Sequence, residues 1–338
     1  MRPFLDSSDA VADGDELYRR MCRDGYLFVR GLIPPAVLEP VRIKWLEIAR
    51  DAGWVDRRTP LERGIADLSG FCAEPQPPYM EVMYRLYREV PEFHAIQHHP
   101  RLIHMLEGML GDTILPHARI IGRTIFPKRT EYTTPAHQDW IPIQGCEETI
   151  TAWIGISDVP KEMGGLQLNA CSHHGGIYNF KPALGAGGTE ITDPLDEDQW
   201  VYSPQAQGDV LFFHSLTVHR GMANTSDRLR LSIDARFQRV SDPVAPGSLG
   251  PHSNGLDWEE FYAGWPEDHP LKYYWKKWDL QVAEYDGSYN EMRDRMALEL
   301  AETGDPSTRG VLERVVNRGN DPARQKRAQE LLNKLGDI

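Results

Sequence analysis

Residues 137–139 read His-Gln-Asp, and residues 210–219 read Val-Leu-Phe-Phe-His-Ser-Leu-Thr-Val-His. Side chains alternate along an extended strand, so His137 and Asp139 are expected to lie on one face. The apolar run before His219 is typical of a buried strand, which would bring this histidine back beside the first pair. Two imidazoles and one carboxylate on one side of a metal form a facial triad with open coordination positions. The two segments therefore predict a metal site formed by His137, Asp139 and His219.

A His-x-Asp pair alone is a weak signal, because a surface loop can hold both residues as solvated side chains. Two neighbouring features strengthen it here. Gly208-Asp209 predicts a tight turn before the apolar run, and Arg230 follows His219 by eleven residues on the expected strand 229–238. Arginine binds a planar carboxylate through two parallel hydrogen bonds. Arg230 is therefore a candidate anchor for a carboxylate ligand.

Two other residues compete for these roles. His214 could replace His219 as the third ligand, but residues five apart on one strand face opposite sides. Only His219 has the eleven-residue spacing to Arg230. Arg236 lies on the same strand face as Arg230 and could bind the carboxylate instead. We prefer His219 and Arg230.

With these motifs the sequence resembles the phytanoyl-CoA dioxygenase family, within the Fe(II)- and 2-oxoglutarate-dependent oxygenases. The resemblance extends over about residues 15–240. The sequence departs from the family pattern at one place: it has Ala170-Cys171-Ser172-His173 where the family often has Pro-Gly-Ser-His. The matching motifs are Asp24-Gly25-Tyr26-Leu27-Phe28-Val29-Arg30-Gly31, His137-Gln138-Asp139, Thr151-Ala152-Trp153-Ile154-Gly155-Ile156-Ser157-Asp158, Gly164-Gly165-Leu166-Gln167, and Gly208-Asp209 through His219 to Arg230.

The resemblance implies a cofactor and a reaction. His137, Asp139 and His219 would bind Fe(II), and Arg230 would hold the distal carboxylate of the co-substrate 2-oxoglutarate. O2 would take the remaining position, and the enzyme would oxidise a small organic molecule while releasing succinate and CO2. Hydroxylation is the expected outcome, although desaturation, epoxidation or ring formation would use the same residues.

Four further residues are candidates for the cofactor-binding region. Ser232 completes the Arg-x-Ser spacing that several relatives use for the same co-substrate. Thr151 and Trp153 match family positions that line the cavity, although a buried tryptophan can equally belong to the core. Gln138 is included because it stands between two of the expected iron ligands.

The expected fold is α+β, with a double-stranded β-helix, a cupin-like jelly roll, as its core. Short apolar runs separated by proline and glycine begin near Ile114 and predict strands at 120–126, 150–156, 166–168, 200–202, 210–214 and 231–237. Helices are expected before them, including one from Pro35 to Gly53, and after them at 257–262, 271–285, 288–301 and 322–335. We therefore divide the chain into an oxygenase domain, 1–245, and a helical C-terminal extension, 246–338.

Composition restricts the possible partners and the location. The 338 residues include 37 basic and 50 acidic side chains, and the net charge of −13 disfavours nucleic-acid binding. No apolar run is long enough to span a bilayer, and the N-terminus lacks a secretory signal, so we expect a cytoplasmic protein without a membrane partner. The four cysteines form no Cys-x-x-Cys pair and predict neither zinc nor disulfides. A homo-oligomer could form through the C-terminal helices.

Three segments are candidates for selecting the substrate: the loops 56–78 and 175–199 and the aromatic start of the extension. Paired glycines at Gly175-Gly176 and Gly187-Gly188 favour a lid in the second loop, while a disordered insertion is the alternative. We expect a largely apolar or amphipathic substrate. Three other functions stay open: a nucleic-acid demethylase of the same superfamily, a cupin enzyme independent of 2-oxoglutarate, and a jelly-roll binding module without enzymatic activity.

Overall fold

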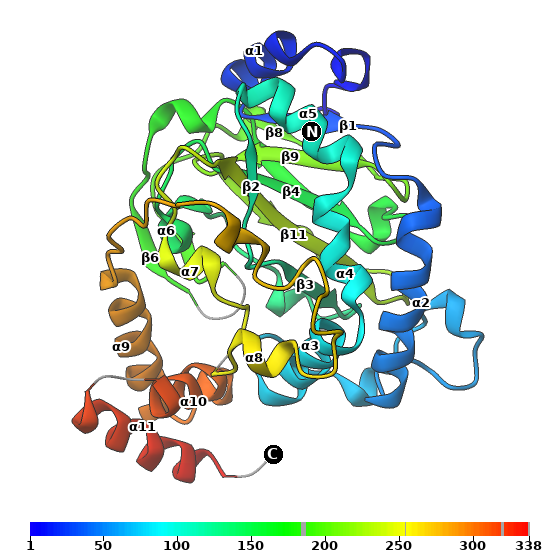
Figure 1. Cartoon of the computed structure of the whole chain (residues 1–338). Helices are drawn as coiled ribbons and strands as arrows, with labels where there is room; N and C mark the ends of the chain where they lie inside the picture. The colour runs from blue at the N-terminus through cyan, green and yellow to red at the C-terminus, as the bar shows by residue number, and fades with distance from the viewer. Residues whose placement is uncertain (184–186, 254, 319–320, 337–338) are drawn as a thin grey trace.

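Two antiparallel sheets form the centre of the computed structural model, which describes residues 1–183, 187–253, 255–318 and 321–336 (Figure 1). The larger sheet has the order β1-β9-β4-β11-β2, with β3 also paired to β11, and the smaller has the order β10-β5-β8. The strands are β1 (Tyr26–Val29), β2 (Ile114–Pro116), β3 (Ile121–Ile125), β4 (Ile150–Gly155), β5 (Leu166–Asn169), β6 (Phe180–Pro182), β7 (Thr189–Ile191), β8 (Trp200–Val201), β9 (Val210–His214), β10 (His219–Gly221) and β11 (Arg230–Arg239). This is the predicted jelly roll.

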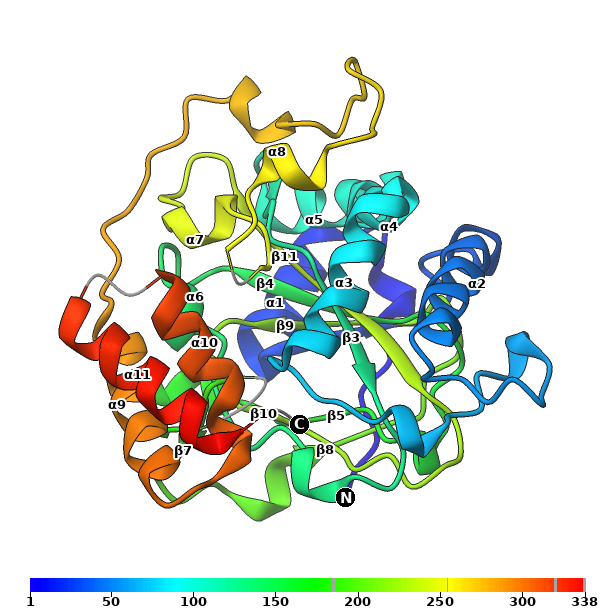
Figure 2. The ribbon, with the colours of Figure 1, turned by 90° about the horizontal axis from the view of Figure 1, so that it is seen from below.

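Helices from the N-terminal third cover one face of the larger sheet. In the longest of them, α2, apolar residues at three- and four-residue spacing such as Leu38, Val41 and Trp45 are fully buried. Figure 2 shows β5, β8 and β10 on the opposite side of β4 and β9 from these helices. The helices are α1 (Gly14–Asp24), α2 (Pro35–Asp51), α3 (Pro77–Glu89), α4 (Pro91–Ala95), α5 (Pro100–Leu110), α6 (Trp140–Ile143), α7 (Pro246–Leu249), α8 (Trp258–Phe261), α9 (Ser288–Glu302), α10 (Arg309–Arg318) and α11 (Pro322–Leu335).

The central strands are buried on both faces, and their alternation determines which side chains reach the interior of the jelly roll. In β4, Ala152 and Ile154 pack against the helices, whereas Trp153 packs between the sheets. In β11, Leu231 and Ile233 face the helices. The even-numbered residues of β11 therefore face inward, and all five are polar: Arg230, Ser232, Asp234, Arg236 and Gln238.

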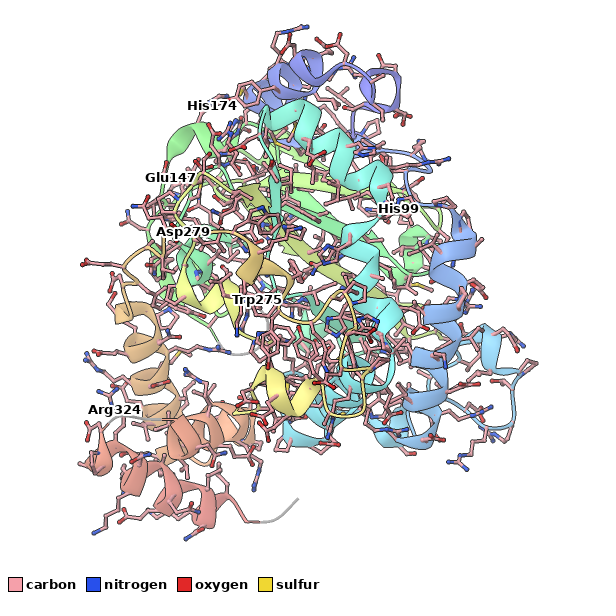
Figure 3. The ribbon with its side chains drawn as sticks, viewed as in Figure 1. His99, Glu147, His174, Trp275, Asp279 and Arg324 are labelled. Carbon is pink, nitrogen blue, oxygen red and sulfur yellow. The ribbon has the colours of Figure 1, made fainter. Side chains whose placement is uncertain are left out.

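The C-terminal extension corrects one helix prediction. Residues 271–285 do not form a helix, since only Tyr274–Lys277 make a 3-10 turn. Tyr273 has a left-handed φ of 50°, which interrupts any helix at that point. The aromatic side chains of this segment pack against one another and against the rest of the protein: Trp275, labelled in Figure 3, contacts the rings of Tyr273 and Tyr274 and belongs to a buried cluster with Leu115 and Val244.

The last three helices form a small group with an apolar core of its own, which includes Leu312 and Leu331 (Figure 1). Of these helices, α9 and α11 were predicted and α10 was not. None of the helices in the described parts of the chain is long and apolar enough to cross a membrane.

Candidate metal centre

The three expected metal ligands meet where the two sheets approach each other. His137 and His219 are joined by a pair of backbone hydrogen bonds, N to O, of 2.9 and 3.0 Å. His219 is the first residue of β10, and Asp139 directly precedes the short helix α6. All three side chains are buried. Within the described residues, they form the one group of three His, Cys, Asp or Glu side chains arranged to hold a metal ion.

The local structure differs from the expectation in two respects. Asp139 has helical backbone angles, φ −66° and ψ −26°, so His137 and Asp139 do not lie on one strand. The run 210–218 is not one strand either, because β9 ends at His214 and the chain turns before β10 begins in the other sheet. The turn is stabilised by the Thr217 hydroxyl, which donates to the carbonyl of Gly25. His219 therefore reaches the site through a change of sheet.

The geometry of the triad suits a metal ion. The candidate ligand atoms all lie within 4.8 Å of one another, and Nε2 of His219 is 3.9 Å from Oδ1 of Asp139. Nδ1 of His137 donates to the Pro135 carbonyl at 2.9 Å, and Nδ1 of His219 donates to the Thr217 carbonyl at 3.0 Å. These bonds fix the tautomer in which Nε2 carries the lone pair that a metal requires. Burial lowers the pKa of His137 to about 3, which also keeps the ring neutral.

Two partners hold the carboxylate of Asp139. The Thr151 hydroxyl donates to Oδ2 at 2.6 Å, and Arg236 donates from Nε to Oδ2 at 3.3 Å and from Nη2 to Oδ1 at 3.2 Å. Burial alone would raise the pKa of this carboxyl, but Arg236 and the two histidines hold the pKa well below its usual range. Arg236 is thus engaged with the metal carboxylate, whereas we had considered it as an alternative anchor for a ligand.

Arg230 is a buried cation that forms no ion pair with a carboxylate among the described residues. Its Nη1 makes only long contacts, of 3.5 Å each, with the carbonyls of Gly165 and Met222. Its Nε has no hydrogen-bond partner, and no described carboxylate forms an ion pair with it. Burial lowers the pKa of Arg230 to about 10. A side chain in this condition fits an anionic ligand that would supply the missing hydrogen bonds.

The remaining predicted residues divide into two groups. Thr151 and Trp153 line the same cavity as the triad and Arg230, and Trp153 also belongs to the core between the sheets. Ser232 is buried with an unpartnered hydroxyl but does not line the cavity. Gln138 is turned away: its Nε2 donates to the carbonyls of Gly176 and Leu216, at 2.8 and 2.6 Å, and its Oε1 accepts from the backbone of residue 178. These hydrogen bonds occupy the side chain of Gln138, so the structure does not support the prediction that it contacts the cofactor.

His214 lies outside the site. It lines a separate, smaller cavity beside His173 and His174. The ring centroids of His214 and His173 are 5.6 Å apart. His219 is therefore the histidine that the fold brings to His137 and Asp139.

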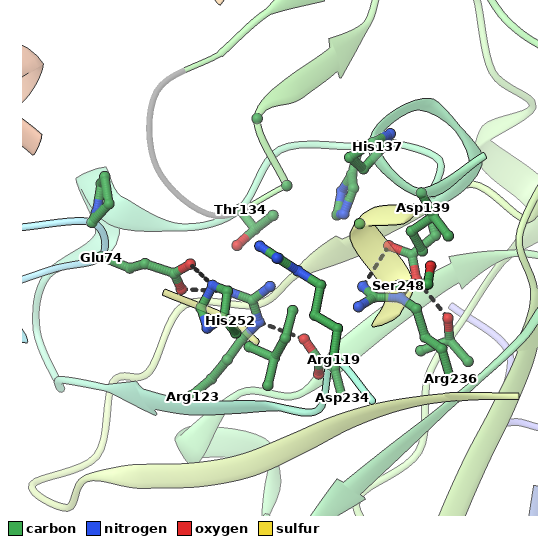
Figure 4. Close-up of a pocket in the computed structure, with 18 of the residues that line it drawn as sticks. Glu74, Arg119, Arg123, Thr134, His137, Asp139, Asp234, Arg236, Ser248 and His252 are labelled. Carbon is green, nitrogen blue, oxygen red and sulfur yellow. Dashed lines mark hydrogen bonds and ion pairs between the residues drawn. The ribbon is translucent and has the colours of Figure 1, made fainter. Parts of the chain in front are cut away.

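Several polar residues of the cavity were not found from the sequence. Arg123 forms ion pairs with both Glu74 and Asp234, and His252 contacts Glu74 at 3.2 Å. Figure 4 shows this network beside the group of His137, Asp139 and Arg236, with Arg119 labelled between the two. The alternation of polar residues along β11 was a signal for Asp234. No local pattern distinguishes Glu74, which belongs to the expected loop 56–78.

The segment 175–199 is more ordered than expected, because it contains the hairpin β6–β7. Gly185 and Ala186 of the expected lid lie outside the described residues. Gly187 has φ of 82°, and a Cβ on it would lie 3.0 Å from Nε2 of His137. A Cβ on Gly188 would collide with the hydroxyl of Tyr289 in α9. Gly187, in the middle of this segment, therefore lies directly against the nitrogen expected to bind metal.

Comparison with known proteins gives a family match. The family model described as phytanoyl-CoA dioxygenase (PhyH) matches residues 21–232. The chain is 23% identical over 265 residues to 1-deoxypentalenic acid 11-beta-hydroxylase of Streptomyces exfoliatus, covering 73% of this chain and 89% of the relative. It is 21% identical over 222 residues to the peroxisomal phytanoyl-CoA dioxygenase of Homo sapiens, covering 63% and 65%. A crystal structure of the epimerase SnoN in complex with Fe3+, alpha ketoglutarate and nogalamycin RO is 22% identical, with a TM-score of 0.47 over 70% of this chain and 87% of that one.

Proposed function

Because the chain belongs to the phytanoyl-CoA dioxygenase family, we propose that it hydroxylates, or otherwise oxidises, a small organic molecule with release of succinate and CO2. Family membership makes it a non-haem iron, 2-oxoglutarate-dependent dioxygenase, as the motifs predicted. The identity of the substrate and the type of oxidation belong to the proposal.

One observation carries the assignment to this site. A buried cluster of His137, Asp139 and His219, with ligand atoms within 4.8 Å, shares a cavity with the buried Arg230, which forms no ion pair with any described carboxylate. A cupin enzyme independent of 2-oxoglutarate would have no use for such an arginine, and a binding module would have no use for the triad. The donor set of two imidazoles and one carboxylate is the one that Fe(II) oxygenases use.

Each group of residues in the site has a distinct role in binding iron or 2-oxoglutarate. Iron bound by the triad would supply the activation of O2 and the oxidation of the substrate. The backbone carbonyls of Pro135 and Thr217 orient the two imidazoles, while Thr151 and Arg236 keep the Asp139 carboxylate ionised and pointed at the metal position. Arg230 would bind the distal carboxylate of 2-oxoglutarate and thereby set its orientation. The ring centroid of Trp153 lies 5.9 Å from the guanidinium carbon of Arg230, and both side chains line the cavity.

The test is 2-oxoglutarate turnover by the purified protein. Incubation with Fe(II), O2 and 2-oxoglutarate should release succinate at a slow rate without substrate, and chelation of the iron should stop it. Succinate release that persists in the His219→Ala variant would refute the assignment of the site. A redox-silent control is Mn(II), which should bind without turnover.

Other parts of the proposal concern partners and organisation. We propose a small-molecule substrate and no nucleic acid, since the net charge is −13, and a cytoplasmic location. The division into residues 1–245 and 246–338 and a homo-oligomer through the C-terminal helices also stay predictions. Light scattering of the purified chain would test the last of these.

A further inference from the structure

One histidine of the cavity has no role in the metal centre. His117 directly follows β2, is buried, and lines the cavity together with the triad. Its backbone N–H donates to the carbonyl of Arg236 at 2.7 Å. Arg236 in turn holds the carboxylate of Asp139, so His117 lies next to the residue that positions a metal ligand. The ring is therefore placed to contact a molecule that binds beside the metal.

The hydrogen bonds around Gln238 determine which nitrogen of His117 carries the proton. Nε2 of Gln238 donates to the carbonyls of Asp242 and Pro243, at 3.1 Å each. Oε1 of Gln238 is therefore the acceptor that faces the imidazole, and Nε2 of His117 donates to it at 2.8 Å. Nδ1 of His117 must then carry a lone pair, because a neutral imidazole has one donor nitrogen and one acceptor nitrogen.

The imidazole of His117 is neutral, and its acceptor nitrogen is available to a ligand. Burial lowers the pKa of His117 to about 4, and the nearby charge of Arg236 also lowers it. Among the residues that the structure describes, none donates a hydrogen bond to Nδ1. A buried acceptor without a donor is unfavourable, and a ligand that supplies a donor removes this cost.

The ligand group that binds Nδ1 of His117 has to be a neutral donor. A carboxylate, a phosphate or a ketone would place an acceptor against the lone pair. An ammonium group is disfavoured by Arg236, whose positive charge is close enough to lower the pKa of His117. Hydroxyl groups and amide N–H groups satisfy both conditions.

Ser248 favours a hydroxyl over an N–H group. It belongs to α7, is buried and lines the cavity, and its carbonyl accepts from the backbone N–H of residue 119, two positions after His117. Figure 4 shows Ser248 toward Asp139 and Arg236 rather than toward Glu74. No described residue forms a hydrogen bond with its hydroxyl, which can donate as well as accept. A ligand hydroxyl can donate to His117 and accept from Ser248, whereas an N–H group can only donate.

Resting on the proposed function, we infer that the substrate carries a hydroxyl group that donates a hydrogen bond to Nδ1 of His117 and accepts one from Ser248, while its apolar part lies beside the metal centre. The cavity volume of about 450 Å³ is suited to a small molecule of this kind. This narrows the expected substrate from a largely apolar or amphipathic molecule to an alcohol. Binding of the hydroxyl would fix which carbon of the substrate faces the metal. Ser248 lies beyond the residues that the family model matches, so the C-terminal extension contributes to this selection.

The first measurement is the nitrogen NMR spectrum of His117 in the full chain, with its histidines isotopically labelled and with Zn(II) and saturating 2-oxoglutarate bound. The His117→Gln variant assigns the resonances, because they are absent from its spectrum. We expect a protonated Nε2 and an unprotonated Nδ1 without ligand, and an upfield shift of the Nδ1 resonance when cyclohexanol or 2-adamantanol is added. A proton on Nδ1 in place of Nε2, or no shift with either alcohol, would overturn the inference.

Matched ligands measure the selectivity. Calorimetry on the same Zn(II)-loaded protein compares cyclohexanol with cyclohexanone, and 2-adamantanol with 2-adamantanone. We expect at least one alcohol to bind about 5- to 30-fold more tightly than its ketone, because the ketone has no donor for the lone pair of Nδ1. Equal affinities within both pairs would overturn the inference. Tighter binding of cyclohexanecarboxamide than of cyclohexanol would overturn the choice of a hydroxyl over an N–H group.

Variants assign the preference to residues. His117→Gln and His117→Phe should each reduce the ratio of alcohol to ketone affinity to below about 2-fold, because a glutamine amide pairs with either ligand and phenylalanine with neither. Ser248→Ala should weaken alcohol binding by about 2- to 10-fold and leave the proton on Nε2 of His117. His104→Gln is the control, because His104 is exposed on α5 and does not line the cavity. A ratio that is unchanged in both His117 variants would refute the assignment.

The same experiment separates this inference from the proposed function. Binding of 2-oxoglutarate to the Zn(II)-loaded protein is measured first, and the alcohol and ketone titrations are then repeated without metal and co-substrate. Failure of 2-oxoglutarate to bind, with selection of the alcohols retained, would contradict the proposed function alone. Normal binding of 2-oxoglutarate without selection of the alcohols would contradict the inference alone.

Discussion

Replacement of Arg230 by methionine should stabilise the ligand-free protein while it removes co-substrate binding. Arg230 is 4% exposed and has no carboxylate partner among the described residues. At pH 7 the guanidinium is charged in both the folded and the unfolded chain, so its lowered pKa measures the unfavourable free energy of burying the charge. Methionine fills the part of the space taken by the aliphatic stem and carries no charge, and apolar replacements of poorly compensated buried ions are often stabilising.

The expected gain in the free energy of unfolding follows from the lowered pKa of Arg230. Burial lowers the pKa of Arg230 from 12.5 to about 10. One pKa unit corresponds to about 1.4 kcal/mol, so the free energy of unfolding of the ligand-free Arg230→Met variant should rise by up to about 3 kcal/mol. Loss of a bidentate, charge-assisted contact of about 1.5 to 4 kcal/mol should weaken 2-oxoglutarate binding by about 10- to 1,000-fold.

Urea unfolding of both proteins, without ligands and then with Mn(II) and 2-oxoglutarate, measures both effects. The wild-type protein should gain stability from 2-oxoglutarate, and the variant should gain little. Arg236→Met is the comparison, because it removes a partner of Asp139 and should weaken metal binding more than co-substrate binding. A variant at position 230 that is less stable without ligands, or that binds 2-oxoglutarate as wild type does, would refute the reasoning. A larger loss of 2-oxoglutarate affinity in Arg236→Met would move the anchor to that residue.

Further predictions concern the metal centre. Gly187→Ala should lower Fe(II) affinity by about 10-fold or more, because its methyl group would lie 3.0 Å from Nε2 of His137. Gly176→Ala is the control, because Gly176 has a similar φ of 70° but a Cβ on it would meet nothing within 4 Å. This variant should lose only about 1 kcal/mol of stability and bind the metal normally. Equal Fe(II) affinities in the two variants would contradict the prediction. Thr151→Val removes the 2.6 Å hydrogen bond to Asp139 and should weaken Mn(II) binding, followed by electron paramagnetic resonance, by about 10- to 100-fold. Added chloride should leave turnover unchanged and yield no chlorinated product by mass spectrometry, because Asp139 occupies the position that halogenating relatives leave open for chloride.

The metal ligands could be predicted because histidine and aspartate bind metal ions and because the chain has no other His-x-Asp pair followed by a histidine and an arginine at the required spacing. His137, Asp139 and His219 converge although the local geometry assumed for them was partly wrong. The eleven-residue spacing from His219 to Arg230 identified His219 without any assumption about the strand that carries it. The prediction therefore did not depend on the change of sheet between His214 and His219. Such a change is not visible in an apolar run, because a buried turn and a buried strand have the same composition.

The rest of the cavity depends on contacts between distant segments, which single-sequence patterns do not encode. Glu74 and Arg123 become partners only when the loop before α3 packs beside β3. Arg293 and Asp294 look like ordinary charges on a solvated helix, and α9 becomes a wall only through its contacts with the β6–β7 region. The segment 271–285 shows that composition can also predict too much. Its residues favour a helix, but the left-handed backbone of Tyr273 interrupts it.

Anaerobic titration of Fe(II) into the metal-free chain is the most direct test of the metal centre formed by His137, Asp139 and His219. We predict one iron per chain, bound in a form that responds to 2-oxoglutarate, and a large loss of affinity in His137→Ala, Asp139→Ala and His219→Ala while circular dichroism reports an intact fold. A wild-type chain that binds no iron, or a His219→Ala variant that binds iron with wild-type affinity, would contradict the assignment.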